Sequence, residues 1–128
     1  MLDAAIFCLA MTIYYEARNE PQIGQDAVAN VILNRADWKL HKICHEVFKP
    51  KQISSFNTPV PIPQEKNKAW RRAQKIARHT LTRGPSWDIT NGATYFYNPT
   101  FADPYWALVC EPRVTIANHH FCYIPYNG

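Results

Sequence analysis

The feature that most constrains the fold is an apolar segment near the N-terminus. Between Ala4 and Tyr15 every residue except Thr12 is apolar or aromatic. A helix that is apolar on all its sides must be covered on all sides by other elements. With Asp3 as a suitable N-cap, the sequence predicts a central, buried helix from about Ala4 to Glu16 or Ala17.

A second helix is predicted directly after the first. Asn19-Glu20 forms the turn, and Pro21 suits the first helical position, where its missing N–H needs no partner. From Pro21 to Arg35 apolar residues recur at helical spacing, and Arg35 falls on the same face. Gly24 costs helix stability relative to alanine, which suggests close backbone packing against the first helix. The residues expected on the outer face are Gln25, Asp26 and Asn34.

Two more helices are expected before residue 85. A short helix over 43–48 ends at Pro50, and an amphipathic helix over 64–82 is closed by Gly84-Pro85. Between them, prolines at alternate positions predict an extended loop over 58–63, the kind of segment that commonly forms a cleft wall. The cations on the outer face of the later helix are Lys66, Lys68, Arg71, Arg72, Lys75 and Arg78. We interpret them first as a solvated face and second as an attraction to phosphate-bearing envelope polymers, which would weaken with salt.

The last third of the chain changes character. A strand is predicted over 93–97, followed by a hairpin with strands over 114–117 and 120–124 around Asn118-His119. Helices first and a small antiparallel sheet in the C-terminal third predict an α+β domain that is mainly helical. At 128 residues the chain suits a single domain over 1–128. Aromatic residues cluster between Tyr95 and Tyr126, where they either form the core or stack on a saccharide.

Composition and charge narrow the class of protein. Nearly half the residues are apolar, about a fifth are charged and the net charge is +4, as in a soluble globular protein. No segment approaches the roughly 20 apolar residues that span a bilayer, so we expect no stable membrane insertion. Met1-Leu2-Asp3 has no cationic leader region, so we expect synthesis in the cytosol, with any export depending on something outside this sequence. We also expect a monomer that binds no nucleic acid and needs no cofactor.

Four cysteines leave several possibilities open. Cys8 is expected to be a small buried hydrophobe in the first helix. Cys110 and Cys122 flank the hairpin and could pair, although a cytosolic origin argues against obligatory disulfides. Cys44 stands between His41 and His45, which leaves open a cysteine nucleophile or a metal site. The spacings match no standard zinc motif, so we predict no metal.

Two carboxylates with unlike surroundings point to acid–base chemistry. Glu16 falls in the last turn of the buried helix, where burial and the negative end of the helix dipole both favour its protonated form. Glu20 precedes the positive start of the next helix, where an anion is stabilised and can cap that helix or pair with a nearby arginine. A carboxylic acid held protonated is what cleavage of a glycosidic bond requires, because the leaving oxygen must receive a proton. Signatures of serine hydrolases, zinc proteases, P-loop enzymes and dinucleotide-binding enzymes are missing.

The same residues resemble a known family. Residues 15–21 (YEARNEP) and 24–35 (GQDAVANVILNR) closely resemble the cell wall hydrolase family typified by the spore-cortex-lytic enzyme SleB. Further similar segments are 43–48, 52–56, 93–99 and 118–121. The resemblance spans nearly the whole chain, and the motif of about twenty residues at its start is the specific part.

The resemblance implies a lysozyme-like catalytic domain acting on peptidoglycan glycan strands. It implies cleavage between N-acetylmuramic acid and N-acetylglucosamine by a lytic transglycosylase, in which one glutamate, here Glu16, serves as acid and then as base. The muramyl 6-hydroxyl replaces water and leaves a 1,6-anhydro end. Muramidase-type hydrolysis with water, a non-catalytic glycan-binding module and an amidase or peptidase using cysteine or zinc are the alternatives. Residues expected to bind the glycan are Glu20, Ser54, Phe56, Tyr95, Tyr97, Asn98 and His120.

The sequence departs from the family pattern at two places. Asn19 stands where the family usually has glycine, and asparagine also tolerates left-handed turn geometry. The aromatic of the segment Ile53-Ser54-Ser55-Phe56 is displaced relative to the family, which puts its sugar contact in question. A catalytic domain made in the cytosol resembles a bacteriophage endolysin, which would be synthesised in the host cytoplasm and reach the cell wall through a holin.

Overall fold

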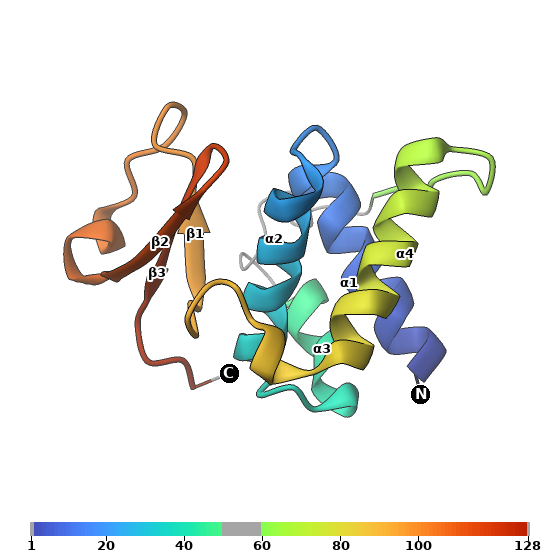
Figure 1. The fold of residues 1–128 in the computed structure, drawn as a ribbon, viewed down its shortest axis with the longest axis horizontal. Coiled ribbons are helices and arrows are strands. Elements are labelled where there is room, and N and C mark those ends of the chain that lie inside the picture. Colours follow the sequence, from blue (N-terminus) through green and yellow to red (C-terminus); the bar gives the residue numbers. More distant parts are fainter. Residues whose placement is uncertain (1, 50–59, 128) are drawn as a thin grey trace.

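The computed structural model describes residues 2–49 and 60–127, with a group of helices beside a small sheet (Figure 1). The helices are α1 (Leu2–Ala17), α2 (Gln22–Arg35), α3 (Leu40–Phe48) and α4 (Lys68–Arg83). The strands β1 (Tyr95–Tyr97), β2 (Glu111–Ile116) and β3 (His119–Tyr123) follow in the C-terminal third. Short 3₁₀ turns, η2 (Pro85–Trp87) and η3 (Tyr105–Val109), lie between these elements. The predicted α+β class is confirmed. No helix in these described stretches is long and apolar enough to cross a membrane.

Helix α1 is the centre of the main core, as its composition predicts. It packs against α2, α3 and α4, and its residues from Cys8 to Ile13 are all buried. Trp70 and Ile76 of α4 and Ile43 of α3 belong to the same core cluster. A helix with no polar face is stable only when it is surrounded in this way.

Helix α2 lies between α1, α4 and the sheet, so its expected outer face is partly covered. Gln25, expected outside, is 1% exposed and donates from Nε2 to the Glu20 carbonyl oxygen at 3.0 Å. Asn34, also expected outside, donates from Nδ2 to Asp88 Oδ2 at 3.0 Å and to the Ala93 carbonyl at 2.9 Å. The prediction that these two residues lie on an outer face was therefore wrong. Helical spacing of apolar residues identifies one buried side of a helix, whereas α2 is covered on several sides. Pro21 is the N-cap and not the first helical residue.

Helix α4 begins at Lys68, four residues later than predicted. Asn67 caps it, its Oδ1 accepting from the Trp70 amide at 3.0 Å. An asparagine N-cap satisfies one of the unpaired amides of the first turn, which fixes the start of the helix at this point. The predicted end is confirmed, because Gly84 takes a φ of +87°, a conformation that costs glycine little.

The sheet has the order β1-β3-β2, and both pairs of neighbours are antiparallel. The turn of the hairpin is Ala117-Asn118, one residue earlier than predicted. His119 instead starts β3 opposite Ile116 and is 8% exposed. The register places Phe96, Val114, Ile116, His119 and Phe121 on one face, which packs toward the helices, and Tyr95, Tyr97, His120 and Cys122 on the other.

All four cysteines form disulfide bonds. Cys8 joins α1 to Cys44 of α3, and Cys110 joins the end of η3 to Cys122 of β3. The expectation that Cys8 is only a small buried hydrophobe was wrong, although Cys8 is buried. Helical packing places Cys8 and Cys44 with 5.2 Å between their Cα atoms, within bonding reach, and sequence spacing gives no sign of this.

Candidate active site

Glu16 stands at the junction between the helices and the sheet. It is the penultimate residue of α1, and the last residue, Ala17, is 2% exposed. Ala17 belongs to a second core cluster together with Val28 of α2 and Phe121 of β3. Because a helical residue is fixed by its neighbours, this packing holds the Glu16 backbone beside the sheet. Glu16 is partly exposed, although the helix that carries it is buried.

Two tyrosines anchor the end of α1 on the side of α4. The Tyr15 hydroxyl donates to the Pro61 carbonyl oxygen, in the segment that leads to α4. The Tyr14 hydroxyl accepts from Asn67 Nδ2 at 3.1 Å, and its ring packs edge-on against Trp70. The last turn of α1 is therefore held by hydrogen bonds as well as by its core contacts.

Arg18 does not lie between the two carboxylates as the order of residues suggests. Its guanidinium carbon sits 4.6 Å from the centroid of the Tyr14 ring, and Nη1 donates to the Tyr14 carbonyl at 3.3 Å. Side chains two positions apart in a helix, such as those of Tyr14 and Glu16, point to roughly opposite sides of the helix. Because Arg18 lies over Tyr14, it is on the side of α1 away from Glu16.

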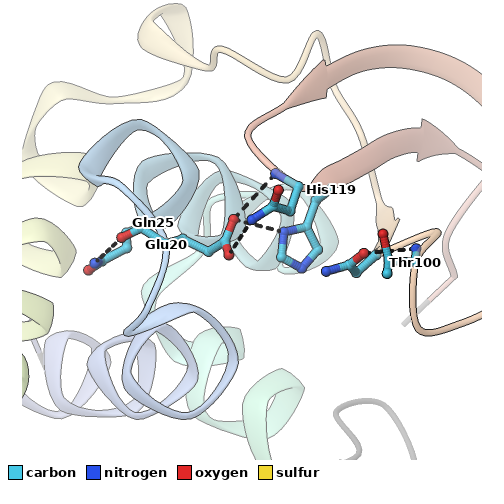
Figure 2. Close-up of polar contacts among 6 residues, drawn as sticks. Glu20, Gln25, Thr100 and His119 are labelled. Atoms are coloured by element: carbon cyan, nitrogen blue, oxygen red, sulfur yellow. Dashed lines mark hydrogen bonds and ion pairs between the residues drawn. The ribbon is translucent and has the colours of Figure 1, made fainter.

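Glu20 is engaged by the hairpin turn. Its carboxylate accepts from the Asn118 amide at 3.4 Å and from Asn118 Nδ2 at 3.2 Å. His119 Nδ1 lies 3.5 Å from Glu20 Oε1, and Figure 2 shows the two side chains pointing toward one another. Among the residues that the structure describes, Glu20 neither caps α2 nor pairs with an arginine, the two roles that the sequence predicted.

The close approach predicted at Gly24 exists, but its partner differs. A Cβ on Gly24 would lie 3.1 Å from the Glu20 Cβ and 3.5 Å from the Ala117 Cβ. Gly24 is therefore packed against the α1–α2 turn and the tip of the hairpin, and not against the body of the first helix. The missing side chain leaves room for the hairpin to reach Glu20.

Tyr97 and His120 lie on the sheet face opposite to the one that carries Phe96 and Phe121. They pair directly across β1 and β3, with 3.4 Å between Tyr97 Oη and His120 Nδ1. Both line a pocket of about 330 Å³ that also includes Arg113 and the two cysteines of the second disulfide. The structure thus groups these two predicted glycan-binding residues with each other.

Tyr95 and Asn98 have partners of a different kind. Tyr95 packs on Trp106, with ring centroids 4.9 Å apart, and on the Arg35 guanidinium at 4.8 Å. Asn98 Oδ1 accepts from the Thr100 amide at 2.9 Å, the contact drawn at Thr100 in Figure 2. Its side chain therefore shapes the turn after β1. The remaining predicted glycan contacts, Ser54 and Phe56, lie outside the described residues.

A buried charged network near the C-terminus was not predicted from the sequence. Glu46 is 3% exposed and accepts from the Tyr126 hydroxyl, and Arg35 donates from Nε to the Thr94 carbonyl at 2.6 Å. The Arg35 guanidinium also lies 5.2 Å from the Tyr126 ring. Arg35 was the one sequence signal for this network, because it is a charged residue at a position where the helical spacing of α2 predicts an apolar one.

Burial sets the protonation of this network. It lowers the pKa of Arg35, and the negative charge of Glu46 opposes that shift, as do the two tyrosines Tyr126 and Tyr95. Burial raises the pKa of Tyr126, and the hydrogen bond to Glu46 raises it further. Tyr126 therefore stays a hydrogen-bond donor, and the network ties the C-terminal tail to α2 and α3.

Cysteine and metal chemistry have little support in this arrangement. Cys44 and Cys122 are both bonded, so neither offers the thiolate that a nucleophile or a zinc site requires. Within residues 2–49 and 60–127 no group of three histidine, cysteine or acidic residues could hold a metal ion. The acidic residues Glu16 and Glu20 remain as the chemically active candidates.

Comparisons with known proteins agree on one family. A family model described as Cell Wall Hydrolase matches residues 19–122. The spore cortex-lytic enzymes of Bacillus subtilis and Oceanobacillus iheyensis are 32% and 30% identical to this chain, each over 89% of its length. Those alignments reach back across the position of Glu16, three residues before the family match begins. The chain spans only 36% and 40% of the length of these two relatives.

Solved structures match the whole fold. The catalytic domain of the Bacillus cereus SleB protein superposes with a TM-score of 0.70 and 28% identity, covering 94% of this chain and 91% of that one. The catalytic domain of the germination-specific lytic transglycosylase SleB from Bacillus anthracis gives a TM-score of 0.68 and 29% identity, covering 96% and 95%. These matches confirm the predicted lysozyme-like arrangement of helices and a small sheet. By its sequence and by its fold, the chain belongs to the cell wall hydrolase family.

Proposed function

We propose that this chain is a peptidoglycan-degrading glycosidase that cleaves the β-1,4 bond between N-acetylmuramic acid and N-acetylglucosamine. Glu16 is its general acid and base, and the enzyme acts as a lytic transglycosylase. The observation that carries the proposal is the position of Glu16, a partly exposed carboxyl in the last turn of a buried helix, beside the sheet. The substrate class follows from membership of the cell wall hydrolase family.

The proposed reaction needs only one carboxyl group. Glu16 first gives its proton to the glycosidic oxygen as the bond to the muramyl C1 breaks. The resulting carboxylate then takes the proton of the muramyl 6-hydroxyl as that oxygen bonds to C1. Glu16 ends protonated, and a 1,6-anhydro product forms without water.

The surroundings of Glu20 support a single catalytic carboxyl. Its oxygens are occupied by Asn118 and His119, and its side chain is 12% exposed. A second catalytic carboxylate would have to face a water or the sugar ring directly. Glu20 therefore serves the site best by fixing the turn that follows Glu16.

The proposed glycan contacts fall into two groups. Tyr97 and His120 border a pocket beside the second disulfide and offer an aromatic face with two polar atoms. Tyr95 and Asn98 support them from β1 and from the turn after it. The glycan contacts expected at Ser54, Phe56 and Glu20 stay predictions.

Glu16→Gln tests the assignment because it keeps the shape of the side chain and removes the proton donor. Digestion of purified peptidoglycan should slow by at least about a hundredfold, the typical contribution of a general acid–base group. Glu65→Gln, the same change at an exposed position, should retain full activity. Wild-type turnover by Glu16→Gln protein would refute the role of Glu16.

Mass spectrometry of the released fragments distinguishes the two reaction types. Transglycosylation gives muramyl ends that are lighter than hydrolysed ends by one water molecule. Reducing ends alone would instead indicate a muramidase that uses water. Binding to peptidoglycan with no released fragments would indicate a glycan-binding module.

The two disulfides bear on where the protein works. Disulfides persist in oxidising compartments and are rare in the cytosol. We propose that both bonds are closed where the protein meets the cell wall, whatever its site of synthesis. Thiol labelling of protein taken from the cytosol and from the wall fraction tests this, since only the cytosolic pool should react. A bacteriophage origin, release through a holin and the monomeric state stay predictions.

A further inference from the structure

Helix α4 carries a row of cations on its exposed side. Lys68, Arg71, Arg72, Lys75 and Arg78 are all exposed, while Trp70, Ala73, Ile76 and Ala77 face the core. The ion pairs within residues 2–49 and 60–127 involve Asp37, Glu111 and Glu20, and none includes a cation of α4. The row therefore forms no ion pair with these described residues along a helix about 24 Å long.

Part of this row lines a concave site shared with α2. The pocket has a volume of about 460 Å³. Its lining residues are Gln22 and Asp26 of α2 and Arg71, Arg72, Lys75, Ile76 and His79 of α4. A second, shallower pocket shares Arg71 and is also lined by Glu65, Lys66 and Gln74. Arg71, Arg72 and Lys75 of the row therefore line concave surface rather than a convex face.

The start of α2 adds further positive character to the same site. Gln22 is its first residue, the N-cap Pro21 makes no side-chain bond, and the first turn holds no acid. The amides at a helix start point outward and favour an anion. Arginine side chains and helix amides together are the groups that hold phosphate oxygens most effectively.

Asp26 is the acid that lines this pocket. Burial raises its pKa, while the positive charges of Arg83 and His79 oppose that shift. Arg71, Arg72 and Lys75 outnumber it, so the pocket remains net positive. Asp26 limits how deeply an anion can enter, and its removal should strengthen binding.

We propose that this cationic hollow, formed by α4 and the start of α2, binds the phosphate groups of a linear phosphodiester polymer attached to the cell wall. The charge complementarity and the length of the row favour a polymer with phosphates at regular intervals over a single small anion. Such a contact would hold the enzyme on the wall between successive cuts. The choice of a wall polymer rests on the proposed function, whereas the binding itself does not require catalysis.

The test measures binding with catalysis switched off. Glu16→Gln protein is mixed with sacculi that carry the phosphodiester polymer, and with the same sacculi after hydrofluoric acid has removed it. Arg72→Gln/Lys75→Gln is compared with Lys39→Gln/Lys42→Gln, which removes the same charge at the same spacing from exposed positions near α3. Glutamine keeps a helix propensity close to that of arginine and lysine, so folding should be retained.

We expect the first double variant to bind untreated sacculi on the order of tenfold more weakly at low salt, in line with the effect of removing two cations from an anionic surface. The control pair should bind nearly as the parent does, and Asp26→Asn should bind more tightly. Stripping the sacculi should weaken the parent and erase these differences. Binding by the parent should also fall steeply with added salt.

Three outcomes would overturn the proposal. Equal losses in the two double variants would show an effect of net charge alone, and unchanged binding to stripped sacculi would exclude the phosphodiester polymer. Equally tight, Arg72/Lys75-dependent binding to phosphatidylglycerol vesicles would assign the hollow to a membrane. Failure of the proposed function would appear separately, as turnover by Glu16→Gln protein, and would leave the binding comparison intact.

Discussion

The Glu20 carboxylate and the Asn118 side-chain amide lie 3.2 Å apart, although 98 positions separate the two residues in the sequence. Glu20 belongs to the turn that follows Glu16, and Asn118 belongs to the tip of the β2–β3 hairpin. Their contact ties the end of α1 to the sheet (Figure 2). This polar contact adds to the apolar packing of Ala17 that holds the end of α1 near the sheet.

Glu20→Ala should lower the free energy of unfolding by about 2 kcal/mol, because hydrogen bonds to a charged group contribute about 1.5–3 kcal/mol. Urea denaturation measures this. A cycle with Asn118→Ala should give a coupling energy of about 1 kcal/mol, and Glu65→Ala, at an exposed position, should have little effect. Strict additivity of the two changes would show that the contact contributes nothing.

Arg35→Ala should destabilise the protein by about 3 kcal/mol or more, since it removes a buried positive charge that interacts with buried Glu46 and the donor to the Thr94 carbonyl. Arg35→Lys should recover only part of the loss, because lysine lacks the Nε donor to Thr94 and the planar group beside Tyr95. Guanidinium chloride denaturation compares both with Arg78→Ala on the exposed face of α4, which should be nearly neutral. Full recovery by lysine would contradict the geometric argument.

Asp26→Asn should make the stability of the protein less dependent on pH. Burial raises the pKa of Asp26 above its ordinary value of 3.8, so ionisation of this group opposes folding. The free-energy cost of ionising Asp26 in the folded protein is absent below the pKa of the unfolded state and complete above the pKa of the folded state. The variant should therefore be more stable than the parent at neutral pH, and the difference should disappear as the pH falls toward 3.8. Thermal melts of the variant and the parent across this range check it, and an equal pH dependence of the two proteins would contradict it.

Loss of either disulfide should lower the free energy of unfolding, and the loss should grow slowly, with the logarithm of the length of the loop that the bond closes. The chain-entropy relation gives about 4 kcal/mol for Cys8–Cys44, with a separation of 36 residues, and about 3 kcal/mol for Cys110–Cys122, with 12. Paired Cys→Ala variants measured by calorimetry, with and without a reducing agent, test this order. A reducing agent that leaves the melting temperature of the parent unchanged would speak against both bonds.

Local signals in the chain were sufficient for most of the secondary structure. The largely apolar composition of α1 and the end of α4 at Gly84-Pro85 each depend on neighbouring residues only, and the structure agrees with both. The predicted bounds were wrong where another local signal or a tertiary contact fixed the start of an element. Asn67 moved the start of α4, and the pairing of His119 with Ile116 moved the hairpin turn by one residue.

The candidate site shows the same contrast between local sequence signals and tertiary contacts. Neighbouring residues alone were enough to place Glu16 in the last turn of a buried helix and Glu20 in the turn that follows, because helical periodicity and the turn at Asn19-Glu20-Pro21 are local properties. What each carboxylate faces depends on the tertiary structure. Asn118 reaches Glu20 across nearly the whole chain, and Arg18 turns back onto Tyr14. Such contacts depend on how the elements pack, and that packing is set by the core as a whole.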